Sequence, residues 1–146
     1  MDPVIRGHCR IRVRYSETDA MAVAHHSSHV AWMEVGRVEL MRSAGMSYAQ
    51  MERDGVSLAL VGLELRYRAA ARFDDLVDIE TSTESCSRVR VAFAYRLSRL
   101  EDQLLLATGR TEHAAVDRNL RPVRLPEPLR RILTADRVFA AMGEVC

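Results

Sequence analysis

One long amphipathic helix is followed by four consecutive strand-like segments, and this order constrains the fold more than any other feature. Helical periodicity runs to Ala44, where Gly45 ends it, and the next apolar segments alternate with period two. The turns between them are short, which favours an antiparallel meander. Only one long helix can cover the apolar face of that sheet, so we predict an α+β fold with a curved antiparallel sheet wrapped around it. The helix is expected over 28–44 and the strands over 58–68, 76–84, 88–97 and 104–117.

Shorter elements flank this pattern. The alternation C-R-I-R-V-R-Y predicts a first strand over 8–15, and a short helix is expected from Ser47 until Gly55. Beyond Pro126 the tail, 126–146, is typical of one or two short helices, P-E-P-L-R-R-I-L and D-R-V-F-A-A-M. We find no repeat, linker or low-complexity stretch, so we expect a single domain over 1–146.

The long helix has a broad apolar arc. Winding at 100° per residue places Trp32 mostly on the polar side. Glu34 and Arg37 fall inside the arc one turn apart, and this spacing predicts an ion pair within the buried face. The arc contains Met33, Val30, Met41, Leu40, Ala44 and Val38.

The composition excludes several classes of chemistry. All 21 basic residues are arginine. Schiff-base, pyridoxal-phosphate and phosphate-loop mechanisms all need a lysine amine, so they are excluded. A net charge of +1 and an aromatic content of 5% also argue against a nucleic-acid-binding protein.

Cysteine usage and hydropathy predict a soluble, cytoplasmic protein. The three cysteines, Cys9, Cys86 and Cys146, are odd in number and widely spaced, which fits neither a disulfide framework nor a paired-cysteine zinc site. We find no signal-peptide core at the N-terminus and no apolar run near the ~20 residues of a membrane span.

A run of polar residues between the first strand and the long helix carries the most specific pattern. It reads Y-S-E-T-D-A-M-A-V-A-H-H-S-S-H-V-A-W-M-E-V-G-R from Tyr15 to Arg37. This run resembles the 4-hydroxybenzoyl-CoA thioesterase family of hotdog-fold enzymes, in particular its bacterial acyl-CoA thioesterase branch. The positions that match the family pattern are Tyr15, Glu17, Thr18, Asp19, Val23, His26, Trp32, Glu34 and Arg37.

The resemblance continues to about Pro126. The segment R-Y-R-A-A-A-R-F-D-D-L-V-D-I-E-T from Arg66 resembles the family's Y-x-x-P-A-R-x-D-D-x-L-x-I-x-T. Two positions depart from the pattern. Ala22 replaces a glycine of the loop, which restricts its backbone, and Ala70 replaces a proline.

The resemblance implies hydrolysis of an acyl-CoA thioester to a free acid and coenzyme A. Asp19 is then the catalytic carboxylate, either as nucleophile or as general base for water, and the residues alone leave both open. The helix N-terminus at His26 is expected to polarise the carbonyl, because free N–H groups there stabilise an oxyanion. The His26 ring is a further candidate to position water or to bond the carbonyl oxygen.

The family also implies how the substrate is held. Arg88 and Arg90 match basic positions expected to meet the coenzyme's phosphates, although an alternating strand alone would place them toward solvent. Homodimers, often paired into tetramers, are typical of the family, with Ser57, Leu58 and their neighbours up to Val61 lining the partner's acyl pocket. The only coenzyme expected is the CoA of the substrate, and no metal or other cofactor is implied.

Alternative functions remain open from the residues. His25, His26 and His29 suggest a metal site, but no acidic or cysteine ligand recurs at a fitting spacing. An acyl-thioester hydratase or dehydratase could use the same fold with an Asp/His pair. A non-catalytic acyl-ligand-binding protein is also compatible, and alanine at Ala22 favours it. No G-x-S-x-G occurs, which argues against a serine hydrolase.

Overall fold

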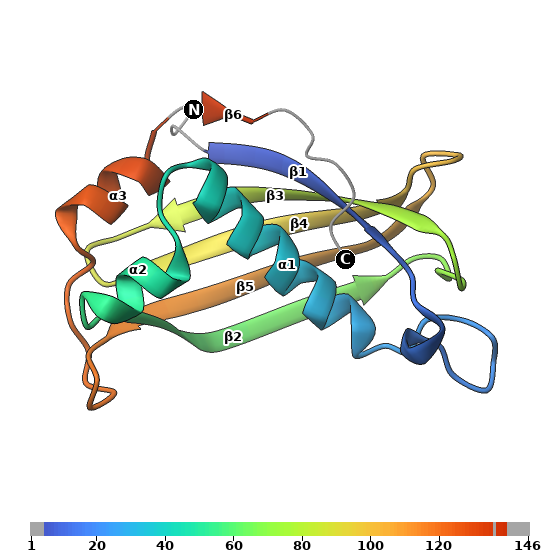
Figure 1. Ribbon diagram of the computed structural model, residues 1–146, viewed down its shortest axis with the longest axis horizontal. Helices are drawn as coiled ribbons and strands as arrows, with labels where there is room; N and C mark the ends of the chain where they lie inside the picture. The colour runs from blue at the N-terminus through green and yellow to red at the C-terminus, as the bar shows by residue number, and fades with distance from the viewer. Residues whose placement is uncertain (1–4, 136, 140–146) are drawn as a thin grey trace.

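The computed structural model describes residues 5–135 and 137–139, which form one six-stranded sheet around a long helix (Figure 1). The strand order is β2-β5-β4-β3-β1-β6, and all neighbours are antiparallel except β1 and β6. The predicted α+β architecture, with the sheet curved around the helix, is confirmed. The strands are β1 Ile5–Arg12, β2 Ser57–Tyr67, β3 Leu76–Cys86, β4 Arg90–Arg99, β5 Leu105–Val116 and β6 Arg137–Val138.

The predicted meander is correct for β3, β4 and β5 but wrong for β2, which pairs with β5 instead of β3. Residues 68–75 therefore cross the end of the sheet to reach β3. Three strand spacings amount to about 14 Å, which eight residues span easily. The crossing segment is held by the backbone N–H of Ala24, which donates to Ala71 O at 2.7 Å, and that of Asp74, which donates to Val13 O at 2.9 Å.

Helix α1, Ser28–Ser43, lies across the concave face of the sheet (Figure 1). It approaches β3 very closely at Gly36. A methyl group there would lie 2.5 Å from Thr81 Oγ1 and 2.7 Å from Ile79 Cγ2. Met33 and Met41 are fully buried. Only a glycine lets the helix pack this deeply against the sheet.

The predicted faces of α1 need two corrections. Trp32 is buried, with 2% of its surface exposed, whereas Val30 is 37% exposed. The indole faces the loop before the helix, and that loop covers a side of α1 that periodicity alone assigns to solvent. The expected ion pair between Glu34 and Arg37 is absent from the described residues, because Arg37 turns toward Tyr48 and Tyr95 instead.

Arg37 belongs to a buried polar cluster beneath α1. Its Nε donates to Tyr48 Oη at 2.9 Å and its Nη1 to Tyr95 Oη at 3.2 Å. Tyr95 Oη lies 2.6 Å from Thr111 Oγ1, which lies 3.0 Å from His113 Nε2. Burial raises the pKa of Tyr48 to about 12 and, with the Arg37 charge, lowers that of His113 to about 4. Both side chains are therefore neutral near pH 7.

Two short helices close one end of the sheet. Helix α2, Tyr48–Arg53, begins at Ser47 as predicted, since Ser47 Oγ accepts from the Gln50 backbone N–H at 3.1 Å. Helix α3, Glu127–Leu133, confirms the first tail helix. The second predicted tail helix, over 136–142, is wrong at Arg137–Val138, because these residues form a strand that pairs parallel with β1. Residues 136 and 140–146 lie outside the described residues.

Strand β2 forms one edge of the sheet and is largely exposed. Its apolar side chains are half exposed to solvent: 53% for Leu60, 50% for Val61, 43% for Leu63 and 49% for Tyr67. A long, flat, apolar edge is a template for pairing with another chain. No helix among the described residues is long and apolar enough to cross a membrane.

Candidate active site

Glu17 fixes the loop that joins β1 to α1. Its Oε1 accepts from the backbone N–H of Arg14 at 2.8 Å, and its Oε2 accepts from Trp32 Nε1 at 2.8 Å. Its backbone oxygen accepts from the His25 N–H at 2.7 Å and from Ser28 Oγ at 2.9 Å. One residue thus ties both ends of the loop to the start of α1. The sequence pattern contained Glu17 and Trp32 but gave no sign of this link.

Asp19 lies in the middle of this loop with one carboxylate oxygen engaged. Its Oδ1 accepts from the Met21 backbone N–H at 2.9 Å, which closes a tight turn and orients the group. Its Oδ2 accepts no hydrogen bond within residues 5–135 and 137–139. Ala22, the departure from the family glycine, adopts the left-handed φ of 63°, and its N–H donates to Asp19 O at 2.9 Å. The turn keeps the glycine-type conformation despite the alanine.

The segment that leads into α1 presents one unused backbone donor. Ser27 occupies the N-cap position, but its hydroxyl lies 2.7 Å from His25 Nδ1 and does not cap the helix. The His26 backbone N–H donates to no acceptor in the described part of the chain. Tyr67 Oη donates to His26 O at 2.7 Å and so fixes that peptide from the end of β2. A positioned, unsatisfied N–H at a helix start is suited to an oxyanion.

His29, in the first turn of α1, packs beside Tyr67, whose hydroxyl holds this peptide. It is 3% exposed, and its ring lies 4.7 Å from that of Trp32 and 4.9 Å from that of Tyr67. Burial lowers its pKa, so the ring is neutral near pH 7. The rings of His25 and His26 pack against each other instead, with centroids 3.9 Å apart. Sequence reasoning considered His29 only as a metal ligand and missed its packing role.

Asp19 and His26 line one cavity of about 380 Å³. This cavity brings together the loop, the start of α1 and the segment that follows β2. Its walls combine the two predicted catalytic residues with Arg68 and several small apolar side chains. The lining is completed by Met21, Val23, Ala24, His29, Tyr67, Ala69, Ala70 and Ala71.

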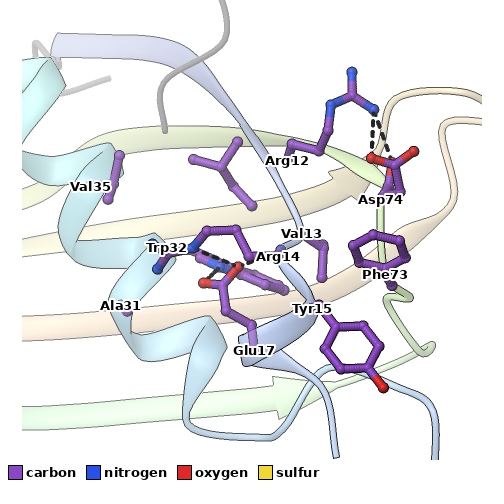
Figure 2. Close-up of a pocket in the computed structure, with 11 residues that line it drawn as sticks. Arg12, Val13, Arg14, Tyr15, Glu17, Ala31, Trp32, Val35, Phe73 and Asp74 are labelled. Carbon is purple, nitrogen blue, oxygen red and sulfur yellow. Dashed lines mark hydrogen bonds and ion pairs between the residues drawn. The ribbon is translucent and has the colours of Figure 1, made fainter.

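A second cavity, of about 420 Å³, lies on the other side of the loop, between β1 and α1 (Figure 2). It is larger and more apolar, with Val35 and Phe73 among its walls, but contains neither Asp19 nor His26. Its carboxylates are engaged: Glu17 by Trp32, and Asp74 by Arg12, whose Nη1 lies 3.7 Å from Oδ1. We therefore assign the candidate site to the cavity that holds Asp19.

The four predicted substrate-binding residues lie at the other end of the sheet in this chain. Ser57 starts β2, whereas Tyr67 ends it beside the candidate site, and ten residues of strand span about 30 Å. Ser57 is exposed and Leu58 packs partly on the core. Arg90 Nη1 forms an ion pair with Glu112 Oε1 at 3.0 Å, whereas Arg88 is exposed just before β4. Their roles stay predictions.

Comparison with known proteins places this geometry in a family. Residues 13–133 match the family model of the thioesterase-like superfamily. The chain belongs to the thioesterase-like superfamily. Acyl-CoA thioester hydrolase YbgC of Escherichia coli strain CFT073 is 33% identical over 95 residues, which are 65% of this chain and 71% of the relative.

Solved structures share both fold and sequence. The crystal structure of hypothetical protein TT1821 from Thermus thermophilus has a TM-score of 0.84 and 38% identity, covering 89% of this chain and 98% of that one. The DHNA-CoA thioesterase from Staphylococcus aureus has a TM-score of 0.80 and 32% identity, covering 83% and 81%. The expected hotdog fold is confirmed.

Proposed function

We propose that this protein hydrolyses an acyl-CoA thioester, with Asp19 as the catalytic carboxylate and the His26 peptide as the electrophilic site. The observation that supports it is the shared cavity: Asp19, which has one uncommitted carboxylate oxygen, and His26, which has an uncommitted backbone N–H, line the same 380 Å³ space. YbgC and the Staphylococcus aureus enzyme are named as CoA thioesterases, which supports the same chemistry. The resemblance of 15–37 and 66–81 favours the 4-hydroxybenzoyl-CoA thioesterase branch.

The reaction follows from these positions. The thioester carbonyl accepts a hydrogen bond from the His26 N–H, which stabilises the oxygen as it becomes negative. Asp19 Oδ2 then either attacks the carbonyl carbon to form an anhydride, which water opens, or removes a proton from water that attacks directly. In both routes the C–S bond breaks, the thiolate takes a proton, and the products are a carboxylic acid and CoA.

The proposed active unit is a homodimer paired through β2, either alone or within a tetramer. A two-fold axis at Gly62, the middle of β2, would place Ser57 of one chain opposite Tyr67 of the other. That arrangement brings the partner's Ser57 and Leu58 to the cavity and covers the exposed apolar edge. It also explains why these residues lie far from Asp19 within one chain. We place the protein in the cytoplasm because its cysteine pattern fits a reducing compartment.

Thiol release from short, long and aromatic acyl-CoAs tests the catalytic assignment, with Asp19→Asn compared with the wild type. We expect Asp19→Asn to lose at least about 100-fold in kcat, as removal of a nucleophile or general base does. Asp54→Asn, the same change at the residue that follows α2, should retain full activity. The assignment fails if no substrate is cleaved or if Asp19→Asn matches the wild type. Hydration of an enoyl-CoA, run in parallel, would instead identify a hydratase.

Subunit mixing tests the composite site. Ser57→Trp places a bulky side chain at an exposed position, where it should block the active-site cavity of the partner subunit. Asp19→Asn removes the catalytic carboxylate of its own chain. Mixed and re-equilibrated, the two inactive variants should regain about a quarter of wild-type activity, because half the dimers are mixed and each mixed dimer has one intact site. If each site is built within one chain, the mixture stays inactive.

A further inference from the structure

A cleft of about 280 Å³ lies on the convex face of β2 and β5, away from α1. It is lined by Glu64, Arg66, Arg68, Thr108, Gly109 and Arg110, and we call it the arginine cleft. Alternation along the end of β2 puts 64, 66 and 68 on one face, and β5 adds Thr108 and Arg110 beside them. Three guanidinium groups thus converge with one hydroxyl and a single lining carboxylate.

The positive charge of the cleft is only partly compensated. Arg110 forms ion pairs with Glu84 and, at 3.6 Å, with Glu112. Arg66 Nε lies 3.8 Å from Glu64 Oε1, a loose and exposed contact that contributes little stability. Arg68 makes no side-chain hydrogen bond or ion pair with any described residue. Arg66 and Arg68 are therefore available to bind an anion.

Arg68 connects this cleft to the candidate active site. Among the residues that the structure describes, it alone lines both the arginine cleft and the cavity of Asp19 and His26. Its backbone N–H donates to Leu106 O at 2.8 Å, which fixes it at the end of β2. A ligand whose reactive end lies beside Asp19 can thus extend past Arg68 and place an anionic group between the arginines.

We propose that the arginine cleft binds the phosphate groups of the CoA substrate, with Arg66 and Arg68 as the principal contacts. This inference rests on the proposed thioesterase function. Guanidinium groups pair with phosphate oxygens through two parallel hydrogen bonds, and Thr108 offers a further donor. The cleft lies on the same chain as Asp19, so Arg66 and Arg68 need no partner subunit to reach a substrate bound in that chain's cavity. Recognition of the phosphates then raises affinity for CoA thioesters over thioesters without a nucleotide.

Paired substrates test this inference. Arg66→Gln and Arg68→Gln are compared with the wild type on one acyl group carried either by CoA or by pantetheine, which lacks the nucleotide phosphates. We expect KM for the acyl-CoA to rise about 10-fold in each variant, with KM for the acyl-pantetheine changing less than about 2-fold. Arg6→Gln, on the same convex face but on β1, should behave as wild type. Equal KM increases for both substrates, or none, would overturn the proposal.

Direct binding separates this inference from the proposed function. Calorimetric titration with CoA, a product that needs no turnover, should show weaker binding to Arg66→Gln and Arg68→Gln and a shallower salt dependence. If CoA binds through the arginines but no acyl-CoA is cleaved, the phosphate site stands and the proposed function fails. If acyl-CoA is cleaved and both variants keep wild-type KM and CoA affinity, the arginine cleft alone is refuted.

Discussion

Replacing Glu17 by glutamine should destabilise the protein and slow its reaction, although the two side chains have nearly the same shape. The Glu17 carboxylate accepts from two N–H donors at 2.8 Å, one from the Arg14 backbone and one from Trp32 Nε1. A carboxamide has one accepting oxygen, so its NH2 group must face the other donor. The loss is one hydrogen bond to a charged acceptor, about 1.5–3 kcal/mol. With 11% of the Glu17 side chain exposed, solvent screens this loss little.

Urea unfolding at pH 7 measures the loss in unfolding free energy, which we expect at about 1.5–3 kcal/mol. Thermal unfolding should show it as a fall in Tm of about 5–10 °C. Because Glu17 positions the loop of Asp19, kcat should also fall. Glu52→Gln makes the same chemical change at an exposed position of α2 and should alter neither quantity. A Glu17→Gln protein as stable as the wild type would refute the assignment of Glu17 as the anchor of the loop.

A double-mutant cycle isolates the contact with Trp32. Trp32→Phe removes the indole N–H and keeps an aromatic ring. In that background Glu17→Gln no longer leaves the indole donor unsatisfied, so it should cost less than in the wild type. We expect a coupling free energy of about 1–2 kcal/mol between the two positions. Strictly additive effects would show that the loop is held by Arg14 and the backbone alone.

Three further changes test other parts of the fold. Gly36→Ala should lower the free energy of unfolding by about 1–2 kcal/mol, measured with urea. The added methyl group would clash with Thr81 and Ile79, and this overpacking costs more than the higher helix propensity of alanine gains. Ala22→Gly should raise stability in the same assay by about 0.5–1 kcal/mol, since φ is 63°. Burial lowers the pKa of His113 to about 4, below the ~6.5 of an unfolded chain, so unfolding takes up a proton in between and stability falls as pH drops from 6.5 to 4. The free energy of unfolding obtained from urea titrations over that range should fall by on the order of 3 kcal/mol, and by clearly less in His113→Gln.

The local elements could be predicted because each has its own periodicity. The alternation of β4 and the helical arc before Gly45 depend only on neighbouring residues, and both elements form where expected. The position of β2 beside β5 could not be predicted the same way. Which strands pair depends on the path that the connecting segment takes. The segment 68–75 crosses the end of the sheet, and its sequence gives no local sign of the backbone hydrogen bonds that hold it there.

The candidate site was predicted in part, for a related reason. Asp19 and His26 were found by resemblance, and the structure brings both to one cavity. Tyr67 and His29 were missed, because their contacts join residues far apart in the sequence. Helical periodicity predicts Trp32 on the polar face, because it treats α1 as buried on one side only, against the sheet. The loop before α1 covers a second side, and no period in the helix encodes that.

The position of α1 depends on polar contacts at two places along it, and these set the geometry of the site. At its start, Glu17 holds Trp32 and the Asp19 loop. At its middle, Arg37 donates to Tyr48 and Tyr95 beneath the helix. Apolar packing alone would tolerate a small rotation of α1, whereas these directional hydrogen bonds do not. In the proposed mechanism the His26 N–H and the Asp19 carboxylate must keep a fixed separation, and these hydrogen bonds would provide it by restraining the helix and the loop before it.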